Sequence, residues 1–133
     1  MLKYLLDTNI VMYVIKRRPV SVMHTFNKHA GHLCVSSITL AELVYGAEKS
    51  AKPEQNLNVV EDFVSRLEVL DYGASAAAHY GDIRASLERA GTPIGVNDLH
   101  IGAHARSRGL ILVTNNAAEF DRIEGLRVEN WVA

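Results

Sequence analysis

Short apolar segments that alternate with longer helical patterns constrain the fold of this 133-residue chain more than any other feature. Strands of a few apolar residues, each followed by a helix, are typical of a parallel sheet covered on both faces. The sequence therefore predicts an α/β fold with a central, mostly parallel sheet, in one domain over residues 1–133. Strands are expected at Tyr4–Leu6, Leu33–Val35, Glu68–Leu70, Leu110–Thr114 and, more weakly patterned, Leu126–Val128.

Helices are predicted where apolar residues recur at every third or fourth position. Thr8 or Asn9 is expected to cap the first helix, which runs to Ile15, and Ser36 and Ser37 are candidate caps for the helix after the second strand. Further helices are expected at Val20–His29, Ile38–Lys49, Leu57–Leu67, Ser75–Ala90 and Asn97–Arg108.

Composition limits the kind of partner that the chain can hold. Fourteen Lys and Arg against 15 Asp and Glu give a net charge of −1, whereas a domain that binds nucleic acid by bulk charge is far more basic. Any contact with RNA or DNA therefore needs a local basic patch or a metal ion. Cys34 is the single cysteine, which excludes an intramolecular disulfide and a Cys-rich zinc site. No apolar run is long enough to cross a bilayer, and we expect a cytoplasmic protein.

Acidic residues follow several of the predicted strands. Asp7 comes directly after the first strand, Glu42 lies one to two helical turns beyond the second, and Asp98 begins the helix before the fourth. Glu119 and Asp121 follow the fourth strand. Right-handed crossovers place all strand-to-helix turns at one edge of the sheet, where ligands of open α/β sheets bind. Clustered carboxylates repel one another unless a cation neutralises them, and oxygen ligands suit Mg²⁺ or Mn²⁺.

A simpler role is available for each acid taken alone. An acid at a helix N-terminus is more often a cap or a partner of the helix dipole, and Asp7 and Asp98 both stand at such positions. Glu42 lies in an otherwise apolar turn, which a capping role does not explain. The joint arrangement therefore favours a metal site that activates water for attack at phosphorus.

Four segments resemble the PIN-domain family and, more narrowly, the VapC toxins of type II toxin–antitoxin pairs. They are LLDTN, SSITLAELVYG, IGVNDLHIGAHA and LVTNNAAEFDRIEGLRVENW, and the resemblance extends over the whole chain. It implies a PIN-like three-layer α/β/α sandwich and a Mg²⁺-dependent endoribonuclease, with Mn²⁺ as a plausible substitute. The expected substrate is structured RNA, often tRNA, and the expected inhibitor is a cognate VapB antitoxin. The resemblance also implies a homodimer and larger toxin–antitoxin assemblies.

The resemblance assigns roles to individual residues. Asp7, Glu42 and Asp98 match the metal-binding acids of the family, and Glu119 matches a fourth acid of the catalytic pocket. Some relatives carry an Asp where Asn116 stands. Asp121 is also close in sequence, so the residue that completes the pocket stays open between these three.

Polar residues beside the first acid are expected to support it. Thr8 and Asn9 match a polar pair of the family, in which Thr8 orients Asp7 or a water molecule. The apolar helix faces near Ile38–Tyr45 and Leu57–Val64 are expected to bind the C-terminal segment of the antitoxin, which would place a basic side chain against the acids.

Basic and histidine patterns carry weaker signals. Lys16, Arg17 and Arg18 form either a solvated helix end or a contact for RNA phosphates beside Asp7. His100 and His104 have the spacing of a zinc-protease motif, but the glutamate base of that motif is missing, so packed or surface histidines are expected.

Two other functions remain as alternatives. One is a PIN-domain nuclease that processes RNA outside any toxin system. The other belongs to a different class: a Mg²⁺-binding, receiver-like signalling domain, which is also a small parallel α/β protein with acids at its strand ends. A receiver needs a second acid beside Asp7 and a Lys after the fourth strand, where this chain has Asn115.

Overall fold

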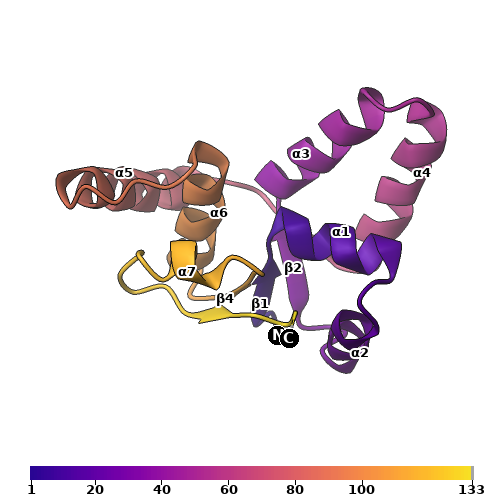
Figure 1. The fold of residues 1–133 in the computed structure, drawn as a ribbon, viewed down its shortest axis with the longest axis horizontal. Coiled ribbons are helices and arrows are strands. Elements are labelled where there is room, and N and C mark those ends of the chain that lie inside the picture. Colours follow the sequence, from indigo (N-terminus) through magenta and orange to yellow (C-terminus); the bar gives the residue numbers. More distant parts are fainter. Residues whose placement is uncertain (133) are drawn as a thin grey trace.

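The computed structural model describes residues 1–132, and these residues contain a five-stranded sheet (Figure 1). The strand order is β3-β2-β1-β4-β5, and every neighbouring pair is parallel. β1 lies at the centre, where Leu5 is in register with Cys34 on one side and Leu112 on the other. The strands are β1 (Tyr4–Leu6), β2 (Leu33–Ser36), β3 (Glu68–Leu70), β4 (Ile111–Val113) and β5 (Val128–Glu129).

The helices occupy the predicted intervals, with two differences. One helix begins four residues before the expected Leu57, because Pro53 takes a first helical position, where proline is well tolerated, and it ends at Val64, three residues before the expected Leu67. A single-turn helix at Ala117–Phe120, labelled α7, was not predicted because four residues are too few to show a periodic pattern. The helices are α1 (Thr8–Lys16), α2 (Val20–Lys28), α3 (Ser37–Glu48), α4 (Pro53–Val64), α5 (Ala74–Arg89), α6 (Val96–Ser107) and α7 (Ala117–Phe120).

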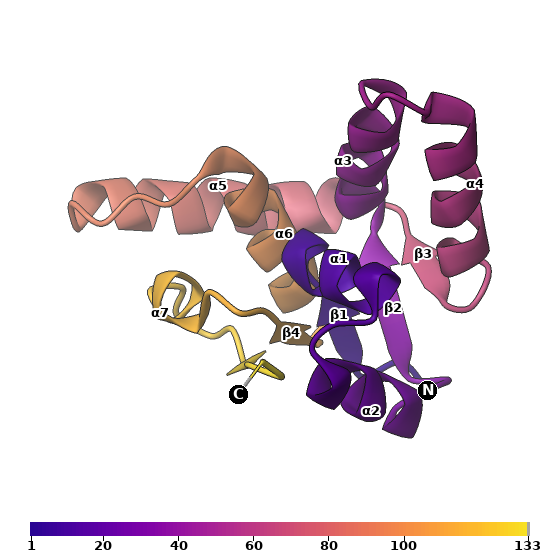
Figure 2. The same ribbon diagram turned by 45° about the vertical axis from the view of Figure 1, so that its right-hand side comes forward.

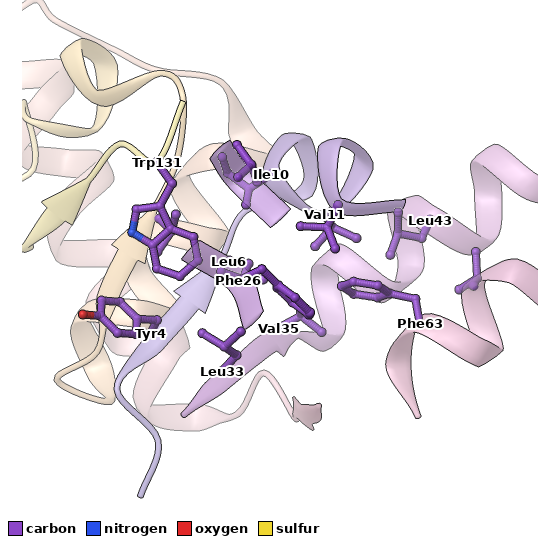
Figure 3. Close-up of a cluster of buried hydrophobic side chains, with 14 of the residues drawn as sticks. Tyr4, Leu6, Ile10, Val11, Phe26, Leu33, Val35, Leu43, Phe63 and Trp131 are labelled. Carbon is purple, nitrogen blue, oxygen red and sulfur yellow. The ribbon is translucent and has the colours of Figure 1, made fainter. Parts of the chain in front are cut away.

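Successive side chains of β1 point to opposite faces of the sheet and so belong to two separate hydrophobic cores. Tyr4 and Leu6 face the core that α1 to α4 cover, and Leu5 faces the core that α5 to α7 cover. Figure 3 shows the first core, where Phe26 of α2 and Phe63 of α4 pack with ring centroids 6.0 Å apart. Figures 1 and 2 show the two groups of helices on opposite sides of the sheet. The fold therefore has the three α/β/α layers that the sequence predicts.

The carboxyl ends of the strands form one edge of the sheet, called the carboxyl edge below. β1 runs directly into α1 and β2 into α3 at this edge. Ser36 caps α3, as one of the two predicted candidates, by accepting a hydrogen bond from the backbone N–H of Ile38. The predicted cap of α1 was wrong: Asp7 is the N-cap, and Thr8 is already helical. Across residues 1–132, no helix combines the length and the apolar character needed to span a membrane.

Candidate active site

Asp7 is fixed in place at the centre of the carboxyl edge. Its side chain is 4% exposed, and one oxygen accepts a hydrogen bond of 2.9 Å from the backbone N–H of Ile10. The β1–β4 register sets Asp7 beside Thr114, whose side chain also hydrogen-bonds to it. Burial raises the pKa of Asp7, and the nearby charge of Glu42 raises it further, against the lowering effect of these hydrogen bonds.

Glu42 lies in the second turn of α3 with hydrogen bonds to both carboxylate oxygens. The Thr8 hydroxyl donates to Oε1 over 2.6 Å, and the Asn97 side-chain amide donates to Oε2 over 3.1 Å. The hydroxyl of buried Thr39 lies 3.2 Å from that of Thr8. The hydroxyl proton of Thr8 is thus directed at Glu42 and not at Asp7.

Asp98 lies in the first turn of α6 and is surrounded by other acids. Its pKa is raised to about 7, first by burial and then by its hydrogen bond with Glu119 and by the charges of Glu119, Asp7 and Glu42. The side chain of Asp98 therefore keeps a proton in neutral solution far more often than an ordinary aspartate. The charges of three other acids thus act on Asp98, and we call Asp7, Glu42, Asp98 and Glu119 the acidic site.

Glu119, in α7, carries the charge of the pair that it forms with Asp98. Burial raises the pKa of Glu119, but hydrogen bonds from Asn116, Asp98 and the Gly95 backbone, together with the charge of Arg122, lower it overall. The Asn116 amide donates over 2.7 Å and the Gly95 N–H over 3.4 Å. Asn116 is thus a donor to Glu119 in this structure.

The remaining predicted polar residues lie outside this cluster. Asp121 is exposed and does not contribute to the pKa shifts of Asp7, Asp98 or Glu119. The side chain of Asn9 is also exposed, but its backbone N–H hydrogen-bonds to Asp7 and lowers the pKa of that acid.

The acidic site has the donor chemistry of a divalent-cation site. None of the ion pairs found within residues 1–132 involves its four acids, and the side-chain groups that hydrogen-bond to them belong to neutral or acidic residues. Hard cations such as Mg²⁺ and Mn²⁺ prefer such oxygen ligands. In the same part of the chain, no three His, Cys, Asp or Glu side chains lie close enough to hold a metal ion. The residue types fit the cation, whereas the side-chain arrangement is not that of a metal-loaded centre.

Three residues in this network were missed by sequence reasoning: Asn97, Thr39 and Thr114. A signal existed for Thr114, because any parallel pairing of β1 with β4 brings the residues that follow the two strands together. Asn97 and Thr39 depend on how α3 meets α6 and α1, which no local pattern shows.

The basic residues at the end of α1 are not beside Asp7. Lys16, Arg17 and Arg18 are exposed, and Asp7 caps the opposite end of this nine-residue helix. The separation along the axis is about 13 Å, because each helical residue advances the chain by ~1.5 Å. Any RNA phosphate that these residues contact therefore lies about 13 Å along α1 from Asp7.

The two histidines of α6 are packed, as expected. His104 is 1% exposed, and its Nδ1 lies 2.7 Å from the Ser36 hydroxyl. His100 lies 2.8 Å from the Tyr72 hydroxyl and stacks on Tyr80 at a centroid distance of 4.2 Å. Both histidines thus help to join α6 to β2 and α5.

The parallel sheet with acids gathered at its carboxyl edge defines the class of protein. The family profile described as PIN domain matches residues 4–126, and the chain belongs to the PIN-domain family. This membership decides against the receiver-like alternative. Nucleases with a PIN domain generally use divalent metal ions.

Within the family, the chain is similar over nearly its whole length to VapC proteins. "Ribonuclease VapC2" of Haemophilus influenzae is 64% identical over 132 residues, which cover 99% of this chain and 100% of the relative. "tRNA(fMet)-specific endonuclease VapC" of Shigella flexneri is 60% identical over 98% of this chain and 99% of its own. The crystal structure of DNA-bound VapBC from Salmonella typhimurium matches with a TM-score of 0.94 and 57% identity, over 98% of this chain and 99% of that one.

Proposed function

We propose that this chain is the ribonuclease toxin of a type II toxin–antitoxin pair, and that it acts in the cytoplasm as one domain over residues 1–133. The observation that carries the proposal is the acidic site, in which the charges of Glu119, Asp7 and Glu42 all act on Asp98 and none of the four acids forms an ion pair within residues 1–132. The identity to proteins named ribonuclease VapC and tRNA(fMet)-specific endonuclease VapC supports it.

Asp7, Glu42 and Asp98 would hold a Mg²⁺ ion in this proposal, or Mn²⁺ in its place, and Glu119 would complete the pocket. A divalent cation at such a site lowers the pKa of a bound water and stabilises negative charge on a phosphate. Asp7 is held by the backbone of α1 and by Thr114, so it provides a fixed oxygen. Glu42 is held from both sides by neutral donors, which bring no positive charge beside its carboxylate.

Asp98 and Glu119 share a hydrogen bond, and the pKa of Asp98 is the higher of the two. This difference suits a site that exchanges protons with water. The pKa of Asp98 is about 7 and that of Glu119 is below its ordinary value. Cation binding would favour the ionised form of Asp98 and release the proton that it carries, so we expect metal binding to strengthen as the pH rises through 7.

The proposed substrate is tRNA, and initiator tRNA is the first to test because two relatives, at 60% and 57% identity, are named for tRNA(fMet). The net charge of −1 leaves little general attraction for RNA. Lys16, Arg17 and Arg18 are proposed to contact phosphates about 13 Å along α1 from Asp7, several nucleotides from the cut.

A groove beside the acidic site is the proposed binding place of a VapB-type antitoxin. It lies between α1, α3 and α4, has a volume of ≈ 350 Å³, and is lined by Met12, Leu43 and Val59. Glu42 borders the same groove, as does Lys16. An apolar antitoxin segment in this groove would reach the acids with a basic side chain, which would block the site and displace the cation.

A homodimer is proposed as the unit that binds the antitoxin. Tyr45 on α3 is 64% exposed and Val96 on α6 is 51% exposed, so apolar surface remains for a second copy to cover. Sedimentation of the free chain at tens of micromolar should show dimers. This concentration is about 10⁻⁵ M, which is far below the dissociation constants of weak encounters. A pure monomer would count against this part of the proposal.

Cleavage of a purified tRNA tests the proposed function. The chain is incubated with initiator tRNA and an elongator tRNA in Mg²⁺ or in EDTA, and new 5′ ends are mapped. Cleavage at one position in Mg²⁺ and none in EDTA is expected. Undiminished cleavage in EDTA, or no cleavage of any tRNA in Mg²⁺ or Mn²⁺, would overturn the proposal. A VapB-like reading frame beside the gene would separate a toxin from a processing nuclease.

A further inference from the structure

Asn97 connects the two helices that carry Glu42 and Asp98. It is the second residue of α6, directly before Asp98, and its amide donates a 3.1 Å hydrogen bond to Glu42 Oε2. Glu42 lies on α3, 55 residues earlier in the chain. Figures 1 and 2 show the start of α6 and the start of α3 on neighbouring sides of the carboxyl edge.

We propose that Asn97 is a positioning residue for the acidic site: its amide fixes the Glu42 carboxylate relative to Asp98. The inference rests on the proposed metal-dependent function and adds to it a residue that touches neither the RNA nor the ion. Asn97 and Asp98 are adjacent in one helical turn. A hydrogen bond from Asn97 to Glu42 therefore sets the distance between Glu42 and Asp98.

Within residues 1–132, neither burial nor helix capping accounts for the side chain of Asn97. It is exposed, so its burial contributes little to the fold. The N-cap of α6 is Gly95, and no side chain caps this helix, so Asn97 does not satisfy the helix N-terminus. The contact with Glu42 is the one hydrogen bond that its side chain makes within residues 1–132.

Asn97 is one half of a clamp on Glu42. Thr8, backed by buried Thr39, holds Oε1, and Asn97 holds Oε2. A free glutamate side chain samples several rotamers, and donors on both oxygens select one of them. Residues placed behind metal ligands in this way typically change metal affinity or activity by about 10- to 100-fold when they are replaced.

The chemistry of an amide suits this position better than that of a basic side chain. A Lys or Arg at position 97 would also bind Glu42, but it would neutralise the charge that attracts the cation and repel the cation itself. The amide donates a hydrogen bond and adds no charge, so the acidic site keeps its negative potential.

The test is binding of Mn²⁺ itself, measured by the electron paramagnetic resonance signal of the free ion. We expect Asn97→Ala to weaken Mn²⁺ binding by about 10- to 100-fold while leaving the unfolding midpoint in EDTA unchanged. Asn97→Gln, which keeps the amide, should recover part of this loss. Asn27→Ala is the matched control: Asn27 is also exposed, but it lies on α2, which leads into the amino end of β2.

A double-mutant cycle separates positioning through Glu42 from any other effect. In a Glu42→Ala background, Asn97→Ala should change Mn²⁺ binding by less than about twofold, because its acceptor is already gone. Equal Mn²⁺ binding by wild type and Asn97→Ala would overturn the inference alone. An undiminished effect of Asn97→Ala in the Glu42→Ala background would also overturn it. Failure of the wild type to bind Mn²⁺ would overturn the metal mechanism, and the inference with it.

Discussion

Asp7 and Asp98 lie at the same edge of the sheet, yet the protein holds them in different ways. Asp7 accepts hydrogen bonds from the Ile10 backbone and from Thr114, so it completes α1 as well as the acidic site. Asp98 makes no capping bond, and its surroundings are dominated by other acids. Asp7 thus supports both the fold and the acidic site. Asp98 belongs to the acidic site alone, and its charge lowers the stability of the folded state.

This difference teaches that capping and metal binding are not exclusive roles for an acid at a strand end. The sequence offered them as competing explanations for Asp7, and the structure shows that its side chain caps α1 within the acidic cluster. Stability alone therefore cannot identify a metal-binding aspartate. The comparison of Asp7 with Asp98 can, because only the second is free of a structural task.

The largest effect is expected for Asp98→Asn. Cleavage of tRNA should fall by more than about 100-fold, because the loss of a ligand exceeds the loss of a residue behind one. Stability in EDTA should stay equal or rise, since the raised pKa shows that the folded state disfavours the charge of Asp98. Cleavage rates and urea unfolding measure the two effects. An active but destabilised variant would make Asp98 a partner of the helix dipole only.

Replacement of Asp7 should separate its two roles. Asp7→Ala should lose cleavage and also about 0.5–2 kcal/mol of stability, because the cap of α1 is removed. Asp7→Asn should lose cleavage but keep most of the stability, since asparagine caps helices about as well as aspartate. Urea unfolding in EDTA compares the two variants. Equal stability of both would mean that the hydrogen bond to Ile10 contributes little.

Stability in EDTA should depend on pH in a direction fixed by the raised pKa values. The folded-state pKa of Asp98 is about 7 against 3.8 in the unfolded chain, so the folded state holds a proton that the unfolded state has lost. The contribution of Asp98 to the free energy of unfolding therefore falls as the pH rises from about 4 to 7 and is constant above 7. The lowered pKa of His104, from burial and Arg108, acts in the opposite direction.

The comparison of wild type with Asp98→Asn cancels the contribution of His104, which is common to both, and leaves that of Asp98 with its hydrogen-bonded partner Glu119. The stability difference between them should grow in favour of the variant from pH 5 to pH 7, as measured by urea unfolding. A difference that does not change with pH would contradict the raised pKa of Asp98.

The smallest effects are expected at Glu119 and Asp121, the two candidates for the fourth acid of the site. Glu119→Gln should reduce cleavage by about tenfold, because Glu119 contacts Asp98 and is held by Asn116 rather than by the helices of the core. Asp121→Asn should change cleavage by less than about twofold, the scatter expected of an exposed surface change. The same cleavage assay ranks the two variants. The reverse order would assign the fourth acid to Asp121.

The first four strands and the place of the acids relative to them were predictable from sequence because they follow from local rules. The weakly patterned last strand was expected at Leu126–Val128, two residues before the observed start of β5. A short apolar run such as Tyr4–Leu6 is a buried strand, and Asp7 and Asp98 occupy positions that parallel topology brings to one edge. The cap of α1 was misplaced by one or two residues because Asp7, Thr8 and Asn9 are all capable of capping.

The hydrogen bonds within the acidic site were beyond sequence reasoning. The contact of Asn97 with Glu42 depends on the placement of α6 against α3, and the contact of Thr8 with Glu42 depends on the approach of α1 to α3. Such contacts are set by how side chains of both cores pack, and no periodicity within one helix reports them.

The most direct test of the account is the effect of Mn²⁺ on unfolding of the wild type and of Asp98→Asn. An ion that binds only the folded state at about 100 times its dissociation constant stabilises it by roughly 2.7 kcal/mol. We predict a higher urea midpoint in Mn²⁺ than in EDTA for the wild type, and no such gain for Asp98→Asn. Equal midpoints for the wild type in Mn²⁺ and EDTA, or the same gain in both proteins, would contradict a cation site built on these acids.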